Sequence, residues 1–374
     1  MKILVVFGTR PEAIKMAPVL KALAASETIR PVLCVTGQHR EMLAEILNFF
    51  ELVPDHDLAL MRPEQDLVYL TSAVLRGMRR VLAAEKPDWV LVHGDTTTAM
   101  AAALAAFYAG CRIGHVEAGL RTGDLRQPWP EEMNRSVVDR ISDRLFAPTA
   151  SARDNLLREN LSADKIVVTG NTVIDALFAV RDALRDAALT RSLAERFGFL
   201  DPAKRLVLVT GHRRESFGRG FDEICAGLRW VAERSDVEIV YPVHLNPAVQ
   251  RPVRRALADL SNVHLIDPVG YVSFVYLMTR SHVILTDSGG IQEEAPALGK
   301  PVLVMREVTE RPEAVAAGTV ALVGTDPQRI YDAVTELLDS PQRYAAFARA
   351  HNPYGDGLAS QRIRDALLRD LSDS

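Results

Sequence analysis

The chain has 374 residues, of which 48% are hydrophobic and 25% are charged, a composition that fits a folded globular protein and excludes a disordered one. Its length exceeds what one hydrophobic core usually fills and predicts about two domains. The formal net charge of -4 argues against a general nucleic-acid binder, so any affinity for phosphate must come from a local cluster of basic side chains and backbone N–H groups.

The three cysteines lie far apart in the chain, at Cys34, Cys111 and Cys225. An odd number at this spacing supplies neither a disulfide framework nor a CxxC pair, so we expect buried free thiols. The N-terminus enters an apolar run at once and lacks the pattern of a signal peptide. The longest apolar tract, residues 99–110, is shorter than the ~20 residues that a membrane helix needs. We therefore expect a cytoplasmic protein.

Short β-branched runs alternate with helical segments through the first half of the chain, which predicts a doubly wound parallel sheet. The first run, residues 3–7, ends in a Gly-Thr turn, and Pro11 then stands in the first turn of a helix, where proline is tolerated. Arg10 and Lys15 flank this helix N-terminus, where backbone N–H groups attract anions. Further strands are expected at residues 31–35, 89–92, 112–116, 145–147 and 166–169.

Two acidic residues follow strands that an Ala-rich crossover helix joins. Asp95 and Glu117 each lie just past the carboxyl end of one of these strands, which is where open α/β sheets bind their ligands. Glu131 follows in a loop that enters a helix. The three carboxylates can converge on one crevice as an acid/base centre, with Arg121 and Arg135 as cationic partners.

A structural interpretation competes with the chemical one. An Asp after a strand often caps the next helix, and Asp95 before three threonines suits that role. The helix macrodipole favours acidic residues in a first turn by ~0.3 to 1 kcal/mol, which would account for Glu131 and Glu132. Taken one at a time, each acid is more often structural than catalytic, and their shared sheet edge is what favours chemistry.

The same order of elements starts again after a helical stretch at residues 173–196. Strands are expected at residues 206–209, 237–241, 263–266, 282–286, 301–305 and 321–323. We therefore predict two Rossmann-like doubly wound α/β domains that face a central cleft. The N-terminal domain comprises residues 1–171 together with a C-terminal helix, residues 358–374, that packs back, and the C-terminal domain comprises residues 172–357.

Polar residues again follow strands in the second half. Ser288, Gly289 and Gly290 open a helix with small residues, so its N–H groups and dipole can hold a diphosphate. Glu294 lies further along that helix, where its carboxylate can accept both hydroxyls of a ribose. His212 follows the first strand of this half and faces the same crevice. The structural alternatives are a plain helix-starting turn, a solvated helix face for Glu294 and a packed or solvated side chain for His212.

Several chemistries lack their sequence signatures. The patterns GxGxxG and GxxxxGK[ST] are absent, so neither a dinucleotide fingerprint nor a P-loop is present. No HxxxH or His/Cys spacing favours a metal, and no nucleophile elbow appears. Proton transfer by carboxylates and histidine beside a bound diphosphate is the chemistry that is left.

Taken together, these motifs resemble the bacterial non-hydrolysing UDP-N-acetylglucosamine 2-epimerases, and the resemblance runs essentially from end to end. It is carried by residues 8–15 (GTRPEAIK), 93–98 (HGDTTT), 115–121 (HVEAGLR), 170–172 (GNT), 211–215 (GHRRE), 286–294 (TDSGGIQEE) and 352–357 (NPYGDG). The resemblance implies a fold similar to the GT-B glycosyltransferases, an active site in the cleft and a homodimer.

The resemblance also implies an activity. Members interconvert UDP-N-acetylglucosamine and UDP-N-acetylmannosamine without a nicotinamide cofactor or metal, by eliminating UDP to an enzyme-bound 2-acetamidoglucal and adding it back. The implied acid/base residues are Asp95, Glu117, Glu131 and His212. The implied UDP-binding residues are Arg10, Lys15, Phe274, Ser288, Gly289, Gly290, Glu294 and Arg311. UDP-N-acetylglucosamine also activates bacterial members at a second site, whose matching positions are Gln38, Glu41, Arg213 and His244.

Other functions stay open at this point. A GT-B-type UDP-sugar glycosyltransferase shares the architecture but needs an acceptor, and hydrolysing epimerases release free N-acetylmannosamine. A UDP-sugar sensor without catalysis would keep Ser288 and Glu294 and lose the acids. Against the glycosyltransferase, only the epimerase would exchange solvent deuterium into carbon 2 of the sugar.

Overall fold

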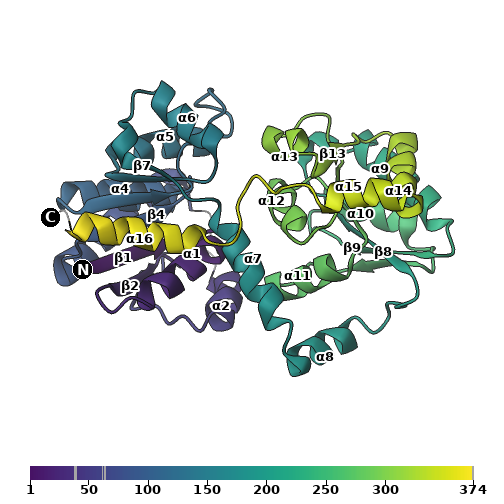
Figure 1. The fold of residues 1–374 in the computed structure, drawn as a ribbon, viewed down its shortest axis with the longest axis horizontal. Helices are drawn as coiled ribbons and strands as arrows, with labels where there is room; N and C mark the ends of the chain where they lie inside the picture. The colour runs from purple at the N-terminus through teal and green to yellow at the C-terminus, as the bar shows by residue number, and fades with distance from the viewer. Residues whose placement is uncertain (38–39, 61, 63–64, 373–374) are drawn as a thin grey trace. The chain divides into compact units, whose positions relative to one another are not determined.

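The computed structural model describes residues 1–37, 40–60, 62 and 65–372 (Figure 1). Residue contacts divide the chain into two compact units. Unit 1 comprises Met1–Ala176 and Tyr354–Ser374, and unit 2 comprises Leu177–Pro353. Each unit is built on a parallel β-sheet of its own.

Unit 1 contains a seven-stranded sheet with the order β3-β2-β1-β4-β5-β6-β7. Its strands are β1 (Lys2–Phe7), β2 (Arg30–Val35), β3 (His56–Asp57), β4 (Trp89–His93), β5 (Arg112–Val116), β6 (Arg144–Ala147) and β7 (Ile166–Val168). Its helices are α1 (Arg10–Ala24), α2 (Arg40–Phe49), α3 (Leu67–Glu85), α4 (Thr97–Tyr108), α5 (Glu131–Ile141), α6 (Ala150–Arg158), the short η1 (Ala163–Lys165) and α16 (Ala359–Ser372). Strand β3 was not predicted, because two residues are too few for hydrophobic alternation to show.

Unit 2 contains a six-stranded sheet with the order β10-β9-β8-β11-β12-β13. Its strands are β8 (Arg205–Thr210), β9 (Val237–Pro242), β10 (Val263–Ile266), β11 (Val283–Thr286), β12 (Val302–Val304) and β13 (Val320–Leu322). Its helices are α8 (Ala187–Arg196), the short η2 (Arg214–Ser216), α9 (Arg219–Ala232), α10 (Pro247–Leu257), α11 (Tyr271–Arg280), α12 (Gly289–Ala297), α13 (Pro312–Ala316), α14 (Pro327–Asp339) and α15 (Pro341–Ala348). The chain passes from unit 1 to unit 2 within α7 (Thr172–Ala183).

Both sheets have the same winding. The chain starts at β1 in unit 1 and at β8 in unit 2, adds two strands on one side, and then crosses to the other side with β4 or β11. The strand order therefore reverses between β1 and β4 and between β8 and β11. Doubly wound sheets bind their ligands at the carboxyl ends of the strands beside such a reversal. The predicted fold class of two doubly wound α/β domains is confirmed.

The helical stretch predicted at residues 173–196 is two helices rather than one. Helix α7 ends at Ala183 and α8 begins at Ala187. The Asp186 side chain accepts hydrogen bonds from Ala188 N and Leu189 N, at 2.7 and 3.0 Å. A side-chain cap of this kind satisfies free N–H groups at the start of a helix, so Asp186 begins α8 as a separate element.

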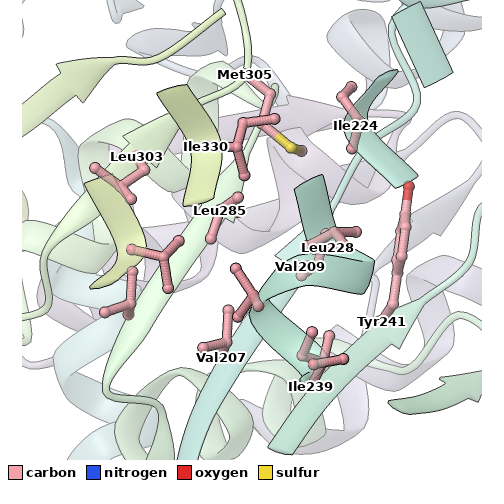
Figure 2. Packing of buried hydrophobic residues seen from close by; sticks show 14 of the residues in the cluster. Val207, Val209, Ile224, Leu228, Ile239, Tyr241, Leu285, Leu303, Met305 and Ile330 are labelled. Carbon is pink, nitrogen blue, oxygen red and sulfur yellow. The ribbon is translucent and has the colours of Figure 1, made fainter. Parts of the chain in front are cut away.

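The core of unit 2 lies between its sheet and the helices α9 and α14 (Figure 2). Alternate residues of the strands point to this face, as Val207 and Val209 do on β8, and Ile330 of α14 belongs to the same cluster. Tyr241 on β9 is fully buried, and its hydroxyl donates to Gly211 O at 3.2 Å. The core therefore also fixes the turn that follows β8.

The C-terminal helix α16 packs against α1 in unit 1 (Figure 1). Asp175 in α7 accepts hydrogen bonds from Ala359 N at 3.2 Å and from Ser360 N at 2.7 Å, so it caps the start of α16. Arg144 at the start of β6 forms an ion pair with Asp370 near the end of the helix. These contacts join the end of the chain to the first sheet.

All three cysteines are free thiols, as the sequence predicted. Cys34 and Cys225 are buried, and burial raises the pKa of each thiol to about 12. Cys111 is only partly buried, which differs from the expectation, because it follows α4 at the rim of a surface groove.

The turn after β5 requires a glycine. Gly119 has φ +87°, and a Cβ at this position would lie 2.3 Å from Ala152 O. Gly119 N donates to Asp139 Oδ2 at 3.2 Å, and Asn155 Nδ2 donates to Gly119 O at 2.8 Å. The turn that carries Glu117 is therefore held on both sides of Gly119.

We expect Gly119→Ala to lower the urea midpoint of unfolding by more than Gly110→Ala does. Both glycines have a positive φ, +87° and +72°, so both alanines meet a backbone cost of about 1–2 kcal/mol. Only the alanine at 119 also meets Ala152 O, because nothing lies within 4 Å of a Cβ at 110. Urea denaturation followed by circular dichroism measures both midpoints. Equal shifts would show that the close contact at Gly119 does not constrain the turn.

Candidate active site

In unit 1 a buried carboxylate holds the turn that follows β1. Glu12 Oε2 accepts hydrogen bonds from Gly8 N at 3.0 Å and from Thr9 N at 2.7 Å. Its other oxygen, Oε1, accepts from Thr96 Oγ1 at 2.6 Å. Glu12 is 2% exposed and links the turns after β1 and β4, the two strands between which the sheet order reverses.

Glu117 lies at the end of β5, where it forms an ion pair with Lys15. Asn171 Nδ2 donates to the same oxygen, Oε2, at 2.9 Å, and His93 Nε2 lies 3.7 Å from it. The backbone of Glu117 has φ +69°, which costs a residue with a side chain of order 1–3 kcal/mol. Such strain persists only where the surroundings impose it, and it is found most often at functional sites.

Electrostatics keep the Glu117 carboxylate ionised. Burial by itself would raise its pKa, but the positive charge of Lys15, with a contribution from His93, outweighs burial and holds the pKa well below its ordinary value of 4.5. The Glu117 side chain is 9% exposed. It is therefore a charged, oriented group with little water around it, which is what an electrostatic or acid/base role requires.

Asp95 follows β4 and is bound through both its side chain and its backbone. Arg135 Nη2 donates to Asp95 Oδ2 at 2.5 Å, and Asn134 Nδ2 donates to Asp95 O at 2.8 Å. The cap of α4 is Thr96, whose hydroxyl accepts from Ala99 N at 3.0 Å. The sequence offered capping of this helix as the structural interpretation of Asp95, but the residue that caps it is Thr96. The Asp95 side chain is 28% exposed and can meet a ligand.

Glu131 is the first residue of α5, beside a second acid with a different role. Glu132 is buried, and its Oε1 accepts from Thr122 N at 2.9 Å and from Gly123 N at 3.0 Å. Glu132 therefore holds the loop that precedes α5. In the described part of the chain no residue forms a hydrogen bond or ion pair with the Glu131 side chain. Glu132 thus has a structural role, and Glu131 is the candidate for chemistry.

A buried network supports these turns from within unit 1. His115 Nδ1 lies 2.6 Å from Asp139 Oδ1, and His115 Nε2 lies 2.8 Å from Gly94 O. Arg121 pairs with Asp139 Oδ2 at 2.7 Å. Burial would raise the pKa of Asp139, but His115 and Arg121 outweigh it and lower the pKa below its ordinary value of 3.8. The network fixes Gly94, and with it the residue that follows.

Arg121 is not a partner of the candidate acids, which corrects the expectation from the sequence. Besides Asp139 it binds Glu159, with Nε 2.6 Å from Oε1 and Nη2 2.8 Å from Oε2. Arg135 does pair with Asp95. The two arginines were equivalent in the sequence, and their separation depends on which buried carboxylate each one meets.

Buried polar atoms that lack a hydrogen-bond partner within the described structure gather at this edge of unit 1. They include Arg10 Nε, both ring nitrogens of His93, Asn134 Oδ1 and Arg135 Nε. Buried polar groups are nearly always bonded, and each exception costs about 1–3 kcal/mol. Several of them lie close to Asp95 and Glu117, so this edge of unit 1 holds polar atoms that a ligand can bind.

In unit 2 a buried carboxylate again holds the turn after the first strand. Asp287 is 1% exposed, and its Oδ2 accepts from His212 N at 2.6 Å and from Arg213 N at 2.7 Å. The His212 ring is 42% exposed, with Nδ1 3.2 Å from Asp287 Oδ1, and it stacks on His244 at a centroid distance of 5.5 Å. Burial lowers the pKa of His212 below 6.5, while the Asp287 charge opposes that shift.

The small residues expected to hold a diphosphate begin α12 directly after β11. Ser288 precedes the helix, and its N–H donates to Thr286 Oγ1 at 3.0 Å. A Cβ added at Gly289 or Gly290 would find its nearest neighbours at 3.7 and 3.6 Å, which is ordinary contact. The packing of unit 2 therefore does not require either glycine.

The other residues of the implied UDP set lie on α11, α12 and the segment before α13. Tyr271 Oη donates to Glu294 Oε2 at 2.9 Å, which orients that carboxylate. Arg311 forms an ion pair with the buried Glu293. Phe274 lies in the first turn of α11 and is partly buried. The structure brings the members of this set that lie in unit 2 to the carboxyl side of its sheet.

Two of the four positions implied for an activator lie in unit 2. Arg213 Nη2 is 3.4 Å from Glu310 Oε2, and His244 stacks on the His212 ring. Gln38 and the side chain of Glu41 lie outside the described residues.

Some residues of these sites were not assigned from the sequence. Asn171 and His93 surround Glu117, Asp287 holds the His212 turn, and Glu293 pairs with Arg311. Each stands inside a motif that the sequence had singled out, so the signal was present. Their roles depend on contacts between segments that are remote in sequence, which no spacing reveals.

Metal clusters and membrane-spanning helices are both absent from the part of the chain that the structure describes. Within those residues no group of three or more His, Cys, Asp or Glu side chains is placed to hold a metal ion. None of the described helices combines the length and the apolar character needed to span a membrane.

Comparisons with known proteins agree with this geometry. The chain matches the family model described as UDP-N-acetylglucosamine 2-epimerase over residues 21–368. It is 59% identical over 369 residues to the UDP-N-acetylglucosamine 2-epimerase of Escherichia coli strain K12, with 98% of each chain covered. It matches the crystal structure of UDP-GlcNAc 2-epimerase from Neisseria meningitidis bound to UDP-GlcNAc with a TM-score of 0.91 at 50% identity, covering 99% of this chain and 100% of that one.

A more distant match shows how far the fold extends. The crystal structure of a glycosyltransferase from Rickettsia africae is 14% identical, with a TM-score of 0.61, and 100% of this chain and 97% of that one are covered. At this identity the likeness concerns the fold alone. The fold therefore does not separate an epimerase from a glycosyltransferase, and the site residues must.

We expect Asp139→Asn to destabilise the protein by about 3–5 kcal/mol at pH 7, because it leaves Arg121 buried with one charged partner fewer. The folded pKa of Asp139 is lowered, so its contribution is present above the unfolded value of 3.8 and is lost as pH falls through the folded pKa. The gap between the urea midpoints of wild type and variant should therefore narrow below about pH 4. Asp154→Asn is the control, since Asp154 is 54% exposed in a surface ion pair. A gap that widens in acid would contradict the assignment.

Proposed function

Because this chain belongs to the UDP-N-acetylglucosamine 2-epimerase family, we propose that it is a cytoplasmic enzyme that interconverts UDP-N-acetylglucosamine and UDP-N-acetylmannosamine. The observation that carries the proposal is the arrangement of three carboxylates at one edge of unit 1. Asp95 pairs with Arg135, Glu117 pairs with Lys15, and Glu131 has no partner among the described residues. Close relatives that bear the epimerase name support the choice of substrate.

The proposed reaction passes through elimination. The proton on carbon 2 is not acidic while the sugar ring is neutral, so a carboxylate removes it only as the bond from carbon 1 to the UDP oxygen breaks and the ring becomes cation-like. UDP leaves, and a 2-acetamidoglucal stays bound. A proton then returns to the opposite face of carbon 2, and UDP adds back to carbon 1. The atoms balance without a redox cofactor.

Stabilisation of the departing UDP carries much of the barrier in this scheme, because charge develops on its oxygen as the bond breaks. We assign that role to Arg10 and Lys15, to His212, and to the N-terminus of α12 at Ser288. Lys15 then has two tasks, since its ion pair also fixes Glu117. The remaining UDP contacts that we propose are Phe274, Gly289, Gly290, Glu294 and Arg311.

Inversion at carbon 2 explains why several acid/base groups are needed. One group removes a proton from one face and another delivers a proton to the opposite face, so a single carboxylate does not suffice. Asp95, Glu117 and Glu131 differ in partner and exposure, and groups in different surroundings can serve different protonation tasks. We propose these three carboxylates and His212 as the acid/base set.

We further propose that the enzyme is a homodimer. An apolar groove of about 850 Å³ lies on unit 1 along α3 and α4, and its lining includes Leu75, Leu82 and Tyr108. Tyr108 is 75% exposed and the neighbouring Phe107 is 55% exposed. Exposed apolar faces of this kind mark interfaces, and a second copy of this chain is the occupant that we propose.

Activation by the substrate is also part of the proposal. UDP-N-acetylglucosamine would bind a second time through Arg213 and His244 together with Gln38 and Glu41. The ring contact between His244 and His212 supports this, since it joins one activator position to one catalytic position within unit 2.

The primary test is proton NMR of UDP-N-acetylglucosamine incubated with the protein in deuterium oxide. We expect the carbon 2 proton signal to disappear while the manno epimer appears with deuterium at carbon 2, because the proton is exchanged during elimination and re-addition. A nucleotide sugar that binds and keeps its proton would overturn the epimerase and favour a glycosyltransferase, which has no step at carbon 2.

The same assay ranks the carboxylates. Asp95→Asn, Glu117→Gln and Glu131→Gln should each lower kcat by about 10²- to 10⁴-fold, the range that general acid/base catalysis supplies. Calorimetric binding of UDP should persist in all three, since none is assigned to UDP. Glu51→Gln is the matched control, because that side chain is 86% exposed and should not affect kcat.

The homodimer is tested by light scattering after size-exclusion chromatography. The wild type should elute with twice the mass of the chain, and Leu75→Glu combined with Tyr108→Glu should elute as a monomer, because two buried charges would oppose the interface. Leu157→Glu changes a partly exposed leucine on α6, outside the groove, and should leave the mass unchanged. A dimeric double variant would place the interface elsewhere.

A further inference from the structure

Two histidines on neighbouring strands of unit 1 are buried to a similar extent and bonded very differently. His93 ends β4 and His115 lies one position before the end of β5, and both point into the interior, with 4% and 0% exposed. His115 has a partner at each ring nitrogen. Neither ring nitrogen of His93 has a hydrogen-bond partner among the described residues.

Packing alone does not account for His93. A buried imidazole without hydrogen bonds costs about 1–3 kcal/mol relative to a bonded one, and an apolar side chain of similar size would avoid that cost. The strand itself is apolar up to this point, as Val90, Leu91 and Val92 show. The change to histidine occurs at the carboxyl end of the strand, next to Gly94 and Asp95.

Among the described residues, the charged group that forms an ion pair with His93 is Glu117, whose Oε2 lies 3.7 Å from His93 Nε2. That oxygen already accepts from Lys15 and Asn171. No described residue donates a hydrogen bond to Oε1. A movement of about 1 Å in either side chain brings His93 to hydrogen-bond distance from Oε2.

We propose that His93 is a positioning residue for Glu117: it accepts the proton that Glu117 takes from carbon 2, holds it while it exchanges with solvent, and returns a proton to Glu117 for the reverse step. The inference rests on the proposed function, because it assigns this role within the epimerisation. Imidazole is the side chain that gains and loses a proton most readily near neutral pH, and an unbonded ring nitrogen is free to accept one.

The step balances in atoms and charge. Glu117 removes the carbon 2 proton, and the electron pair of that C–H bond forms the double bond of the glucal as the bond to UDP breaks. The O–H bond formed on Glu117 then breaks, an N–H bond forms on His93 Nε2, and the products are a carboxylate and an imidazolium. Lys15 favours this transfer, because its charge stabilises the ionised form of Glu117.

The test compares His93→Gln with the wild type in three measurements: UDP binding by calorimetry, kcat and KM for each epimer, and the deuterium content at carbon 2 of starting epimer recovered from deuterium oxide. Glutamine keeps a polar side chain and removes the basic nitrogen. We expect UDP binding and KM to stay within about threefold while kcat falls about 10²-fold, as loss of a proton-transfer group does.

The deuterium content at carbon 2 distinguishes a proton-transfer role from a structural one more sharply than kcat does. In the wild type the proton passes from Glu117 to His93 and exchanges with solvent, so recovered starting material carries deuterium. In His93→Gln the proton stays on Glu117 and returns to the same carbon, so one of the two epimers is recovered with its protium. A merely structural role would not alter that isotope ratio.

The outcomes are separable. Wild-type kcat in His93→Gln, deuterium in both recovered epimers as in the wild type, or a parallel loss of UDP binding and of the urea midpoint would each overturn the inference. His56→Gln serves as the matched control, since His56 pairs with Glu85 at the edge strand β3 and should behave as wild type. A wild type that fails to epimerise overturns the proposed function itself, whereas an active wild type with a normal His93→Gln overturns this inference alone.

Discussion

The buried ion pair between Lys15 and Glu117 is the contact on which the site of unit 1 depends most. Glu117 is held in a left-handed backbone conformation and out of water, and both conditions are costly for a charged residue. Lys15 from α1 and Asn171 from the start of α7 offset that cost by binding one of its oxygens. Elements that are far apart in sequence thus meet at a single carboxylate. Because the pair is buried, removing either partner would leave an uncompensated charge, so the geometry is strongly specified.

The two units use different residues to hold the turn that follows their first strand. A turn that follows the first strand of a doubly wound sheet exposes backbone N–H groups, and each unit satisfies two of them with one buried carboxylate. In unit 1 the carboxylate is Glu12, which comes from the helix after the turn. In unit 2 it is Asp287, which comes from the end of the neighbouring strand β11. The turn is rigid in both cases, so the side chains that it carries, Arg10 and His212, begin from fixed positions.

Adjacent polar residues along this chain differ in whether their side chains hold the local backbone. Thr96 caps α4 and releases Asp95, and Glu132 holds a loop while Glu131 stays without a partner among the described residues. On α12 the buried Glu293 pairs with an arginine, and the next residue, Glu294, is oriented by a tyrosine. Successive residues of a helix point about 100° apart, so one of two neighbours faces the interior and the other is more exposed. Once it is known which face of the helix packs against the interior, the roles of two neighbouring acids can therefore be distinguished.

What the sequence determined by itself was the winding and the position of the candidate residues at the carboxyl ends of the strands. Alternating strands and helices follow from short-range patterns, and polar residues that end apolar runs must lie at the carboxyl edge of a parallel sheet, which placed Asp95, Glu117 and His212 correctly within their units. Only the tertiary structure decided which polar side chains have hydrogen-bond or ion-pair partners within the protein. It assigned Arg121 to Asp139 and Arg135 to Asp95, gave the cap of α4 to Thr96, and left the His93 ring unbonded next to Glu117. The reason is physical: a strand or a helix is specified over a few residues, whereas an ion pair depends on which remote segment packing brings within 4 Å.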